Sequence, residues 1–158
     1  FDKSILIWSH VMHNLICFFY QLPIFLIFYF LGLVKFNVYT FLLLPNLLIV
    51  FIINIGVTAV LCIIVTRFRD IQRFISSSII IIMITTPILW KPNMVEGLRK
   101  LVYQLNPIYY IIELIRTPLL GIKPDVNLYL ISITIAIIFL FLGCFFYKKY
   151  SSTIIFRI

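Results

Sequence analysis

Charge is scarce in this sequence. Only 11% of its residues are charged, against about 25% in an ordinary soluble domain, whereas 63% are hydrophobic and the mean hydropathy is +1.16. So few polar side chains cannot cover the surface of a water-soluble core of this size. The composition therefore excludes a soluble domain and indicates a membrane protein, with an all-α, polytopic fold.

Acidic residues are the scarcest charged type: there are five, and each stands alone. Metal-dependent group transfer needs paired carboxylates, and nucleophilic catalysis needs cysteine–histidine or serine–histidine constellations, none of which is visible. A membrane enzyme acting on lipid-linked sugars, such as a glycosyltransferase or acyltransferase, stays open as one alternative. An ion-coupled transporter is a second, disfavoured because no carboxylate lies in the middle of an apolar segment.

Cysteine is also rare. Cys17, Cys62 and Cys144 each lie within an apolar stretch, without metal-ligand spacing, so we interpret them as small hydrophobic side chains and predict no metal site. The 13 basic residues flank apolar segments instead of clustering on one surface. The net charge of +8 therefore indicates membrane topology and not a nucleic-acid partner.

The stretch from Thr66 to Trp90 organises the rest of the chain. A charged segment, 67–73, interrupts nearly continuous apolar sequence. Each charge at the centre of a bilayer costs about 2.5–3.5 kcal/mol even on the mildest insertion scale. We therefore predict a loop at a membrane surface over Arg67–Arg73, with a membrane-spanning segment on either side.

Apolar runs of the required length predict about four transmembrane helices, over residues 7–34, 39–65, 74–88 and 128–147. The third is the weakest, because only 17 residues separate Phe74 from Trp90 inclusive. Pro87 disfavours helical geometry in the residue before it, so this helix either barely spans or stops inside the outer half of the bilayer.

Two short amphipathic helices are predicted between the third and fourth spans, over residues 93–105 and 107–120. Asn93 with Glu96 resembles a capping box, and Asn106 followed by Pro107 is a strong helix start. At about 13 residues, or about 20 Å, neither helix can cross a membrane. We predict that they lie in the interface or form a re-entrant hairpin on the outer side.

Orientation rests on a count of basic residues. If the chain starts inside, seven basic residues are cytoplasmic and six are outside. The compact charged segment 67–73 and the pair Lys148-Lys149 concentrate the positive charge, so we place both on the cytoplasmic side.

Five short matches in order make the chain resemble the permease subunit of ABC-2 type polysaccharide exporters, the group that moves O-antigen, capsule or teichoic-acid glycans. The matching segments are 1–6 (FDKSIL), 66–71 (TRFRDI), 86–90 (TPILW), 105–107 (LNP) and 112–121 (IELIRTPLLG). The resemblance implies a six-span subunit of which this is the C-terminal part, with an amphipathic N-terminal helix, the first two spans and most of the coupling helix upstream.

The resemblance also implies partners and location. Such subunits work as homodimers with two separate ATP-binding cassette ATPase subunits in the bacterial inner membrane, and move a lipid-linked glycan. No cofactor is expected in this chain, since ATP and magnesium would bind the ATPase partner. The sequence itself contains no G-x-x-x-x-G-K-[ST] phosphate loop.

Four groups of candidate residues follow, and no catalytic or metal site is among them. Aromatic rings at the outer mouth could stack on sugar faces, and Glu113 and Arg116, at spacing i, i+3, are expected to form a structural pair. His10, His13, Asn14, Asn46 and Asn54 are expected to join helices or lie at interfaces. The candidates for ATPase coupling at the cytoplasmic surface are Asp2, Lys3, Arg67, Arg69, Asp70 and Arg73, and those for the substrate path are Trp90, Tyr103, Tyr109 and Tyr110.

Overall fold

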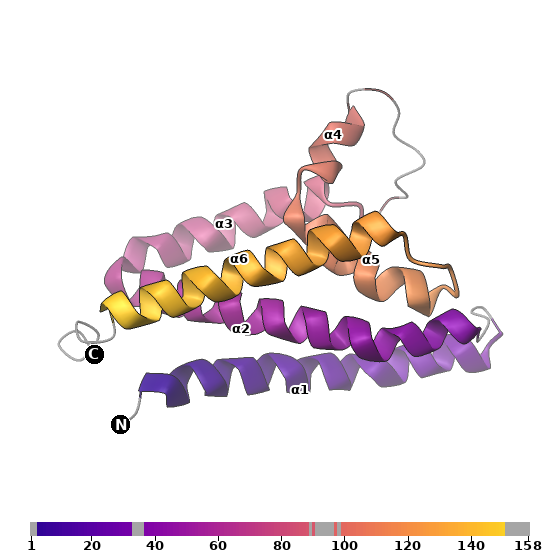
Figure 1. The fold of residues 1–158 in the computed structure, drawn as a ribbon, viewed down its shortest axis with the longest axis horizontal. Helices are drawn as coiled ribbons and strands as arrows, with labels where there is room; N and C mark the ends of the chain where they lie inside the picture. Colours follow the sequence, from indigo (N-terminus) through magenta and orange to yellow (C-terminus); the bar gives the residue numbers. More distant parts are fainter. Residues whose placement is uncertain (1–2, 33–36, 89, 91–96, 98, 151–158) are drawn as a thin grey trace.

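The computed structural model describes residues 3–32, 37–88, 90, 97 and 99–150. Of these residues 87% are helical and none is in a strand, which confirms the all-α membrane fold. Long helices lie side by side, and two short ones gather at one end (Figure 1). The elements are α1 (Lys3–Phe30), the 3-10 helix η1 (Val38–Leu42), α2 (Leu43–Arg67), α3 (Arg69–Thr85), α4 (Arg99–Gln104), α5 (Pro107–Leu119) and α6 (Val126–Tyr150).

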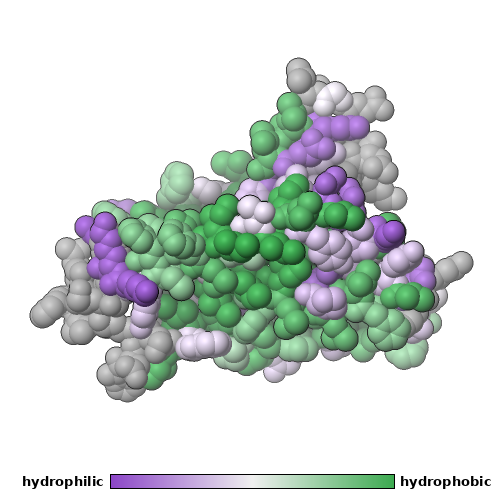
Figure 2. Space-filling view, viewed as in Figure 1, coloured by the Kyte–Doolittle hydropathy of each residue, from purple (hydrophilic) through white to green (hydrophobic). Residues whose placement is uncertain are grey.

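Three helical segments among the described residues are long and apolar enough to cross a membrane: Ile7–Phe30, Val38–Arg67 and Val126–Lys149. In the space-filling view a hydrophobic band covers the middle of the molecule and hydrophilic residues lie toward its ends (Figure 2). The third predicted span, 74–88, corresponds to α3, which is not among these three segments; it has 17 residues and begins with Arg69 and Asp70. Its apolar part, from Phe74 to Thr85, covers only about 18 Å of a hydrocarbon core about 30 Å thick.

The charged segment 67–73 is not a loop, as the sequence predicted, but a sharp joint between two helices. Only Phe68 leaves helical geometry, with φ −128° and ψ 92°, between the end of α2 at Arg67 and the start of α3 at Arg69. The charges favour helix here, because Arg67 lies in a C-terminal turn and Asp70 in an N-terminal turn, where the helix dipoles stabilise them. The predicted loop was wrong because charged residues at a membrane surface can remain helical; charge determines their depth in the membrane but not their backbone geometry.

The closest helix contact joins α2 to α6. A Cβ on Gly56 would lie 2.6 Å from the Phe139 carbonyl carbon and 2.7 Å from its oxygen. On the same faces, a Cβ on Gly143 would lie 3.2 Å from both Ala59 Cβ and Gly56 O. Small residues let two backbones approach this closely, which is how membrane helices gain packing energy without a hydrophobic drive.

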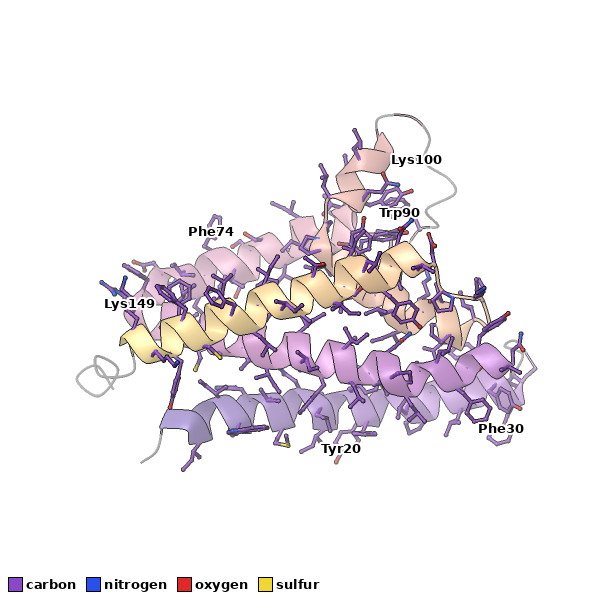
Figure 3. The ribbon with its side chains drawn as sticks, viewed as in Figure 1. Tyr20, Phe30, Phe74, Trp90, Lys100 and Lys149 are labelled. Carbon is purple, nitrogen blue, oxygen red and sulfur yellow. The ribbon has the colours of Figure 1, made fainter. Side chains whose placement is uncertain are left out.

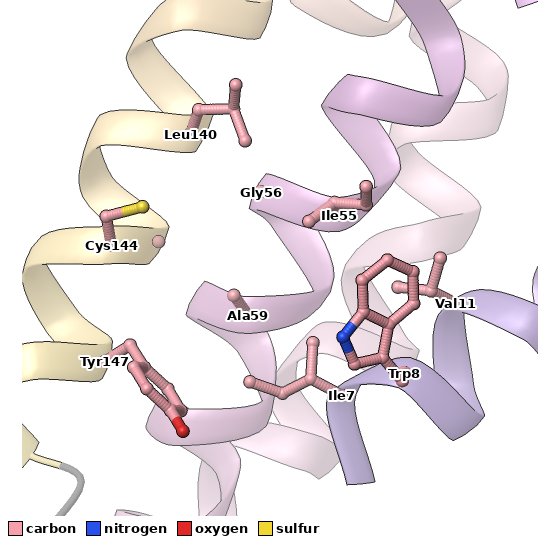
Figure 4. A pocket seen from close by; sticks show the side chains of 10 residues that line it. Ile7, Trp8, Val11, Ile55, Gly56, Ala59, Leu140, Cys144 and Tyr147 are labelled. Carbon is pink, nitrogen blue, oxygen red and sulfur yellow. The ribbon is translucent and has the colours of Figure 1, made fainter. Parts of the chain in front are cut away.

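The helix α1 lies at the edge of the molecule and packs against α2 along a single face (Figure 1). Val11 is fully buried on that face, while Tyr20 points away from the other helices and is 77% exposed (Figure 3). An apolar groove forms where α1, α2 and α6 meet, lined by Ile7, Trp8, Gly56, Leu140 and Tyr147 among others (Figure 4).

The two ends of the helix bundle are formed by different parts of the chain. The start of α1, the joint at Phe68 and the end of α6, with Lys148 and Lys149, lie at one end of the helices (Figure 1). The helix α5 and the connection to α6 lie toward the other end. The first of these we call the basic end and the second the α5 end.

Candidate functional site

Pro87 breaks α3 near the α5 end, and side chains satisfy the carbonyl groups that the break leaves open. Thr86 is extended, with φ −89° and ψ 134°, as expected for a residue before proline. The indole Nε1 of Trp90 donates to the Ile84 carbonyl at 3.2 Å, and Arg116 Nη1 donates to the Pro87 carbonyl at 2.9 Å. The broken helix end is therefore held in a defined geometry by residues that follow it in the chain.

Asn106 connects this break to α5. Its side-chain oxygen accepts a hydrogen bond from the Ile108 amide at 3.0 Å, which caps α5 at its start. Its Nδ2 donates to Thr86 Oγ1 at 2.7 Å, and the fully buried Thr86 hydroxyl donates in turn to the Ile82 carbonyl at 2.7 Å. One asparagine thus both starts α5 and fixes it to the end of α3.

A second proline defect lies inside α5 and is repaired by α2. Pro118 has no N–H, so it cannot donate to the carbonyl of Leu114, its partner four residues back in the helix. Asn46 of α2, fully buried, donates its Nδ2 to that carbonyl at 2.7 Å. The amide of Asn46 replaces the missing backbone donor and joins α5 to the bundle.

Glu113 and Arg116 lie on the same side of α5, with Arg116 Nη1 3.3 Å from Glu113 Oε1. The side chains are 12% and 28% exposed, respectively. Because the same Arg116 nitrogen also donates to the Pro87 carbonyl, the pair is part of the connection between α3 and α5. A carboxylate this buried needs a cationic partner, and Arg116 supplies it.

Four aromatic side chains form one cluster beside this junction. Trp90 meets Tyr103 at 5.9 Å between ring centroids, Tyr103 meets Tyr109 at 4.9 Å, and Tyr109 meets Tyr110 at 5.1 Å, all edge to face. These are the four rings that the sequence assigned to the substrate path, and the structure brings them together. Tyr103 is only 6% exposed and contacts both Trp90 and Tyr109, while the other three rings are half-buried.

The Tyr109 phenol is an uncharged hydrogen-bonding group at physiological pH. Burial raises the pKa of Tyr109 to about 12, and the nearby Glu113 carboxylate adds to this effect, while Arg116 opposes it. Tyr110 donates its hydroxyl to the Gln104 carbonyl at 2.8 Å, which fixes the ring between α4 and α5. The cluster thus presents aromatic faces and edges in a fixed arrangement.

A family model for the ABC-2 type transporter matches residues 3–120, from the start of α1 to the end of α5. The chain belongs to the ABC-2 type transporter family. It is a membrane subunit of an ABC transporter, and it is a multi-pass membrane protein whose family domain is that of a transport subunit. Members of this family typically work with ATP-binding cassette subunits. No curated protein and no solved structure matches the chain.

In this ABC-2 subunit the predicted coupling residues of the charged segment 67–73 lie at the basic end, where α2 meets α3, whereas α4 and α5, which carry the tyrosines of the aromatic cluster, lie away from that end (Figure 1). Arg67, Asp70 and Arg73 are exposed there, and the Arg67 guanidinium lies 5.6 Å from the centroid of the Phe68 ring. Asp2 lies outside the described residues, and for Lys3 and Arg69 the structure describes only the backbone. The predicted capping box of Asn93 and Glu96 also falls outside the described residues.

Sequence reasoning missed the repair of α5 by Asn46. The signal was available: a proline inside a helix leaves one carbonyl four residues earlier without a donor, and a buried donor elsewhere must supply it. Asn46 was predicted to join helices, but its acceptor depends on tertiary packing. Within the part of the chain that the structure describes, no three His, Cys, Asp or Glu side chains gather to hold a metal ion.

Proposed function

We propose that this ABC-2 subunit exports a lipid-linked polysaccharide across the bacterial inner membrane, as one half of a homodimer driven by two ATPase subunits. The aromatic cluster of Trp90, Tyr103, Tyr109 and Tyr110 is the observation that carries the proposal. Pyranose rings present apolar faces that stack on aromatic rings, and phenol hydroxyls bond sugar hydroxyls. Trp90, Tyr109 and Tyr110 contact the glycan as it leaves, and Tyr103 supports them from behind.

The basic end of the molecule is the proposed contact surface for the ATPase. Arg67, Asp70 and Arg73 are exposed at the joint between two helices, which suits a surface that receives a mechanical input. Lys148 and Lys149 lie at the same end and carry the positive charge expected on the cytoplasmic face. In this proposal the ATPase acts on the basic end, and the cargo leaves past the aromatic cluster.

The test begins with deletion of the gene and analysis of the cell's lipid-linked glycans. Export predicts that finished glycan accumulates on the cytoplasmic face and disappears from the surface. If the glycan is never made, the chain belongs to its synthesis; if the surface is unchanged, the cargo is another molecule. Either of these results contradicts the proposal.

Point variants then test the aromatic cluster. Tyr110→Ala and Trp90→Ala remove a ring worth about 1 kcal/mol of contact with sugar, which corresponds to an export rate about fivefold lower. Trp90→Phe keeps a ring but loses the bond to the Ile84 carbonyl, so recovery in this variant separates stacking from a structural role. Phe141→Ala, at an aromatic residue of α6 that is 71% exposed, is the control and should export normally.

A further inference from the structure

The helix α1 carries a polar face that the proposed function does not use. His10, Asn14, Cys17 and Gln21 are all exposed, and they recur at spacings of four, three and four residues. At 3.6 residues per turn these positions fall within about 60° of one another and extend about 16 Å along the helix. We call them the polar stripe.

The polar stripe is distinct from the face that packs on α2. That face is formed by Val11, fully buried, with half-buried residues one turn away on either side, and its centre lies about 100° around the helix from the stripe. The two faces meet at Asn14, whose Nδ2 donates to Asn54 Oδ1 of α2 at 3.1 Å. Thr58 Oγ1 donates to the same oxygen at 3.0 Å, so the polar surface continues onto α2.

Lipid does not suit the polar stripe. Amide and imidazole groups in hydrocarbon lose their water without gaining a partner, and ionisable groups inside a membrane face a protein interior or a water-filled cavity. The stripe occupies the first half of the candidate span Ile7–Phe30, so this constraint applies to it. Either another helix or water must cover it.

The residue types favour water. Membrane helices pack through small residues, as α2 and α6 do at Gly56, Ala59 and Gly143. The helix α1 contains no glycine and no alanine, and its stripe projects the large side chains of histidine, asparagine and glutamine. Such side chains keep a neighbouring backbone at a distance and offer hydrogen bonds, which is what the wall of an aqueous path requires.

We propose that the polar stripe of α1 lines a water-filled path through the assembled transporter. The sequence holds no acidic residue between Asp2 and Asp70, so this wall offers hydrogen bonds without negative charge. It therefore suits a cargo rich in hydroxyl groups and does not concentrate cations. That choice of cargo rests on the proposed function, whereas the presence of water along the stripe does not.

Thiol labelling tests the path in the complete transporter, in its native membrane. Single-cysteine variants are made in a background with Cys62→Ser and Cys144→Ser. The stripe is probed by native Cys17 and, with Cys17→Ser added, by His10→Cys and Gln21→Cys. The matched controls, also with Cys17→Ser, are Met12→Cys, Ile16→Cys and Phe19→Cys, which lie at similar depths on the far side of α1 and are 40%, 51% and 54% exposed.

The probe is a charged, membrane-impermeant methanethiosulfonate. The thiolate is the reacting species and forms readily only in water, so stripe positions should react at least about tenfold faster than their controls. Slow reaction at all six positions would mean that another helix covers the stripe and would overturn the proposal. Equal, rapid reaction at all six would overturn it too. Gene deletion tests glycan export separately, so the two proposals can fail independently.

Discussion

At the scale of single residues, the molecule repairs its own proline defects with side chains from other elements. Pro87 and Pro118 each deprive a helix of a backbone donor, and Trp90, Arg116 and Asn46 bond carbonyls around these defects. Because Thr86, Leu114 and Pro118 are buried, each repair supplies a hydrogen bond that the proline has removed from a part of the backbone with little access to water.

Asn46 and Pro118 give a direct test of this account. Asn46→Leu leaves the Leu114 carbonyl buried without a donor, and should lower the free energy of unfolding by about 1–3 kcal/mol. Pro118→Ala restores a backbone N–H to the same carbonyl, so Asn46→Leu should cost less in that background. Thermal unfolding of the four purified proteins in a double-mutant cycle measures the difference. Additive effects would contradict the repair.

At the scale of elements, the contact between α2 and α6 tolerates no added atoms. Gly56→Ala places a methyl group 2.6 Å from backbone of α6, which cannot move aside as a side chain can. We expect a loss of stability of about 1–3 kcal/mol, by overpacking. Gly143→Ala should cost less, since its new atom would lie 3.2 Å from its neighbours.

The control for this pair is Leu61→Ala, on an exposed part of α2. It should leave the unfolding temperature of the purified transporter nearly unchanged. If Gly56→Ala were as mild as Leu61→Ala, the two helices would not be in the close contact described above.

Helix ends could be predicted from the sequence where neighbouring residues determine them. The helix predicted at 107–120 is observed at Pro107–Leu119. Its start could be predicted because the adjacent residues Asn106 and Pro107 supply the cap and the first helical position. Pro87 likewise ended α3. The joint at Phe68 was missed because helix continues through charged sequence. The junction of Thr86, Asn106 and Arg116 could not be predicted, because it depends on where α3 and α5 meet in space.

At the scale of the whole molecule, the helices place Arg67, Arg73, Lys148 and Lys149 at the basic end, which makes the predicted orientation testable. With native cysteines replaced by serine, Gln72→Cys at the basic end should resist an impermeant maleimide in intact cells and react after permeabilisation. Lys123→Cys, in the connection between α5 and α6, should react in intact cells. The positive-inside rule is the reason. The reverse pattern would place the basic end outside.

The joint at Phe68 has a mechanical consequence. Because a single residue separates two helices, α3 is an arm about 25 Å long, and a change of backbone angles at Phe68 would swing it as a unit. A rotation of about 5° at the pivot would move the far end of that arm by about 2 Å, given the same helix length. That far end is hydrogen-bonded to α5, because Asn106 donates to the Thr86 hydroxyl and Arg116 donates to the Pro87 carbonyl. In the proposed mechanism, a small displacement imposed by the ATPase at the basic end would thus be magnified into a shift of the aromatic rings about one helix length away.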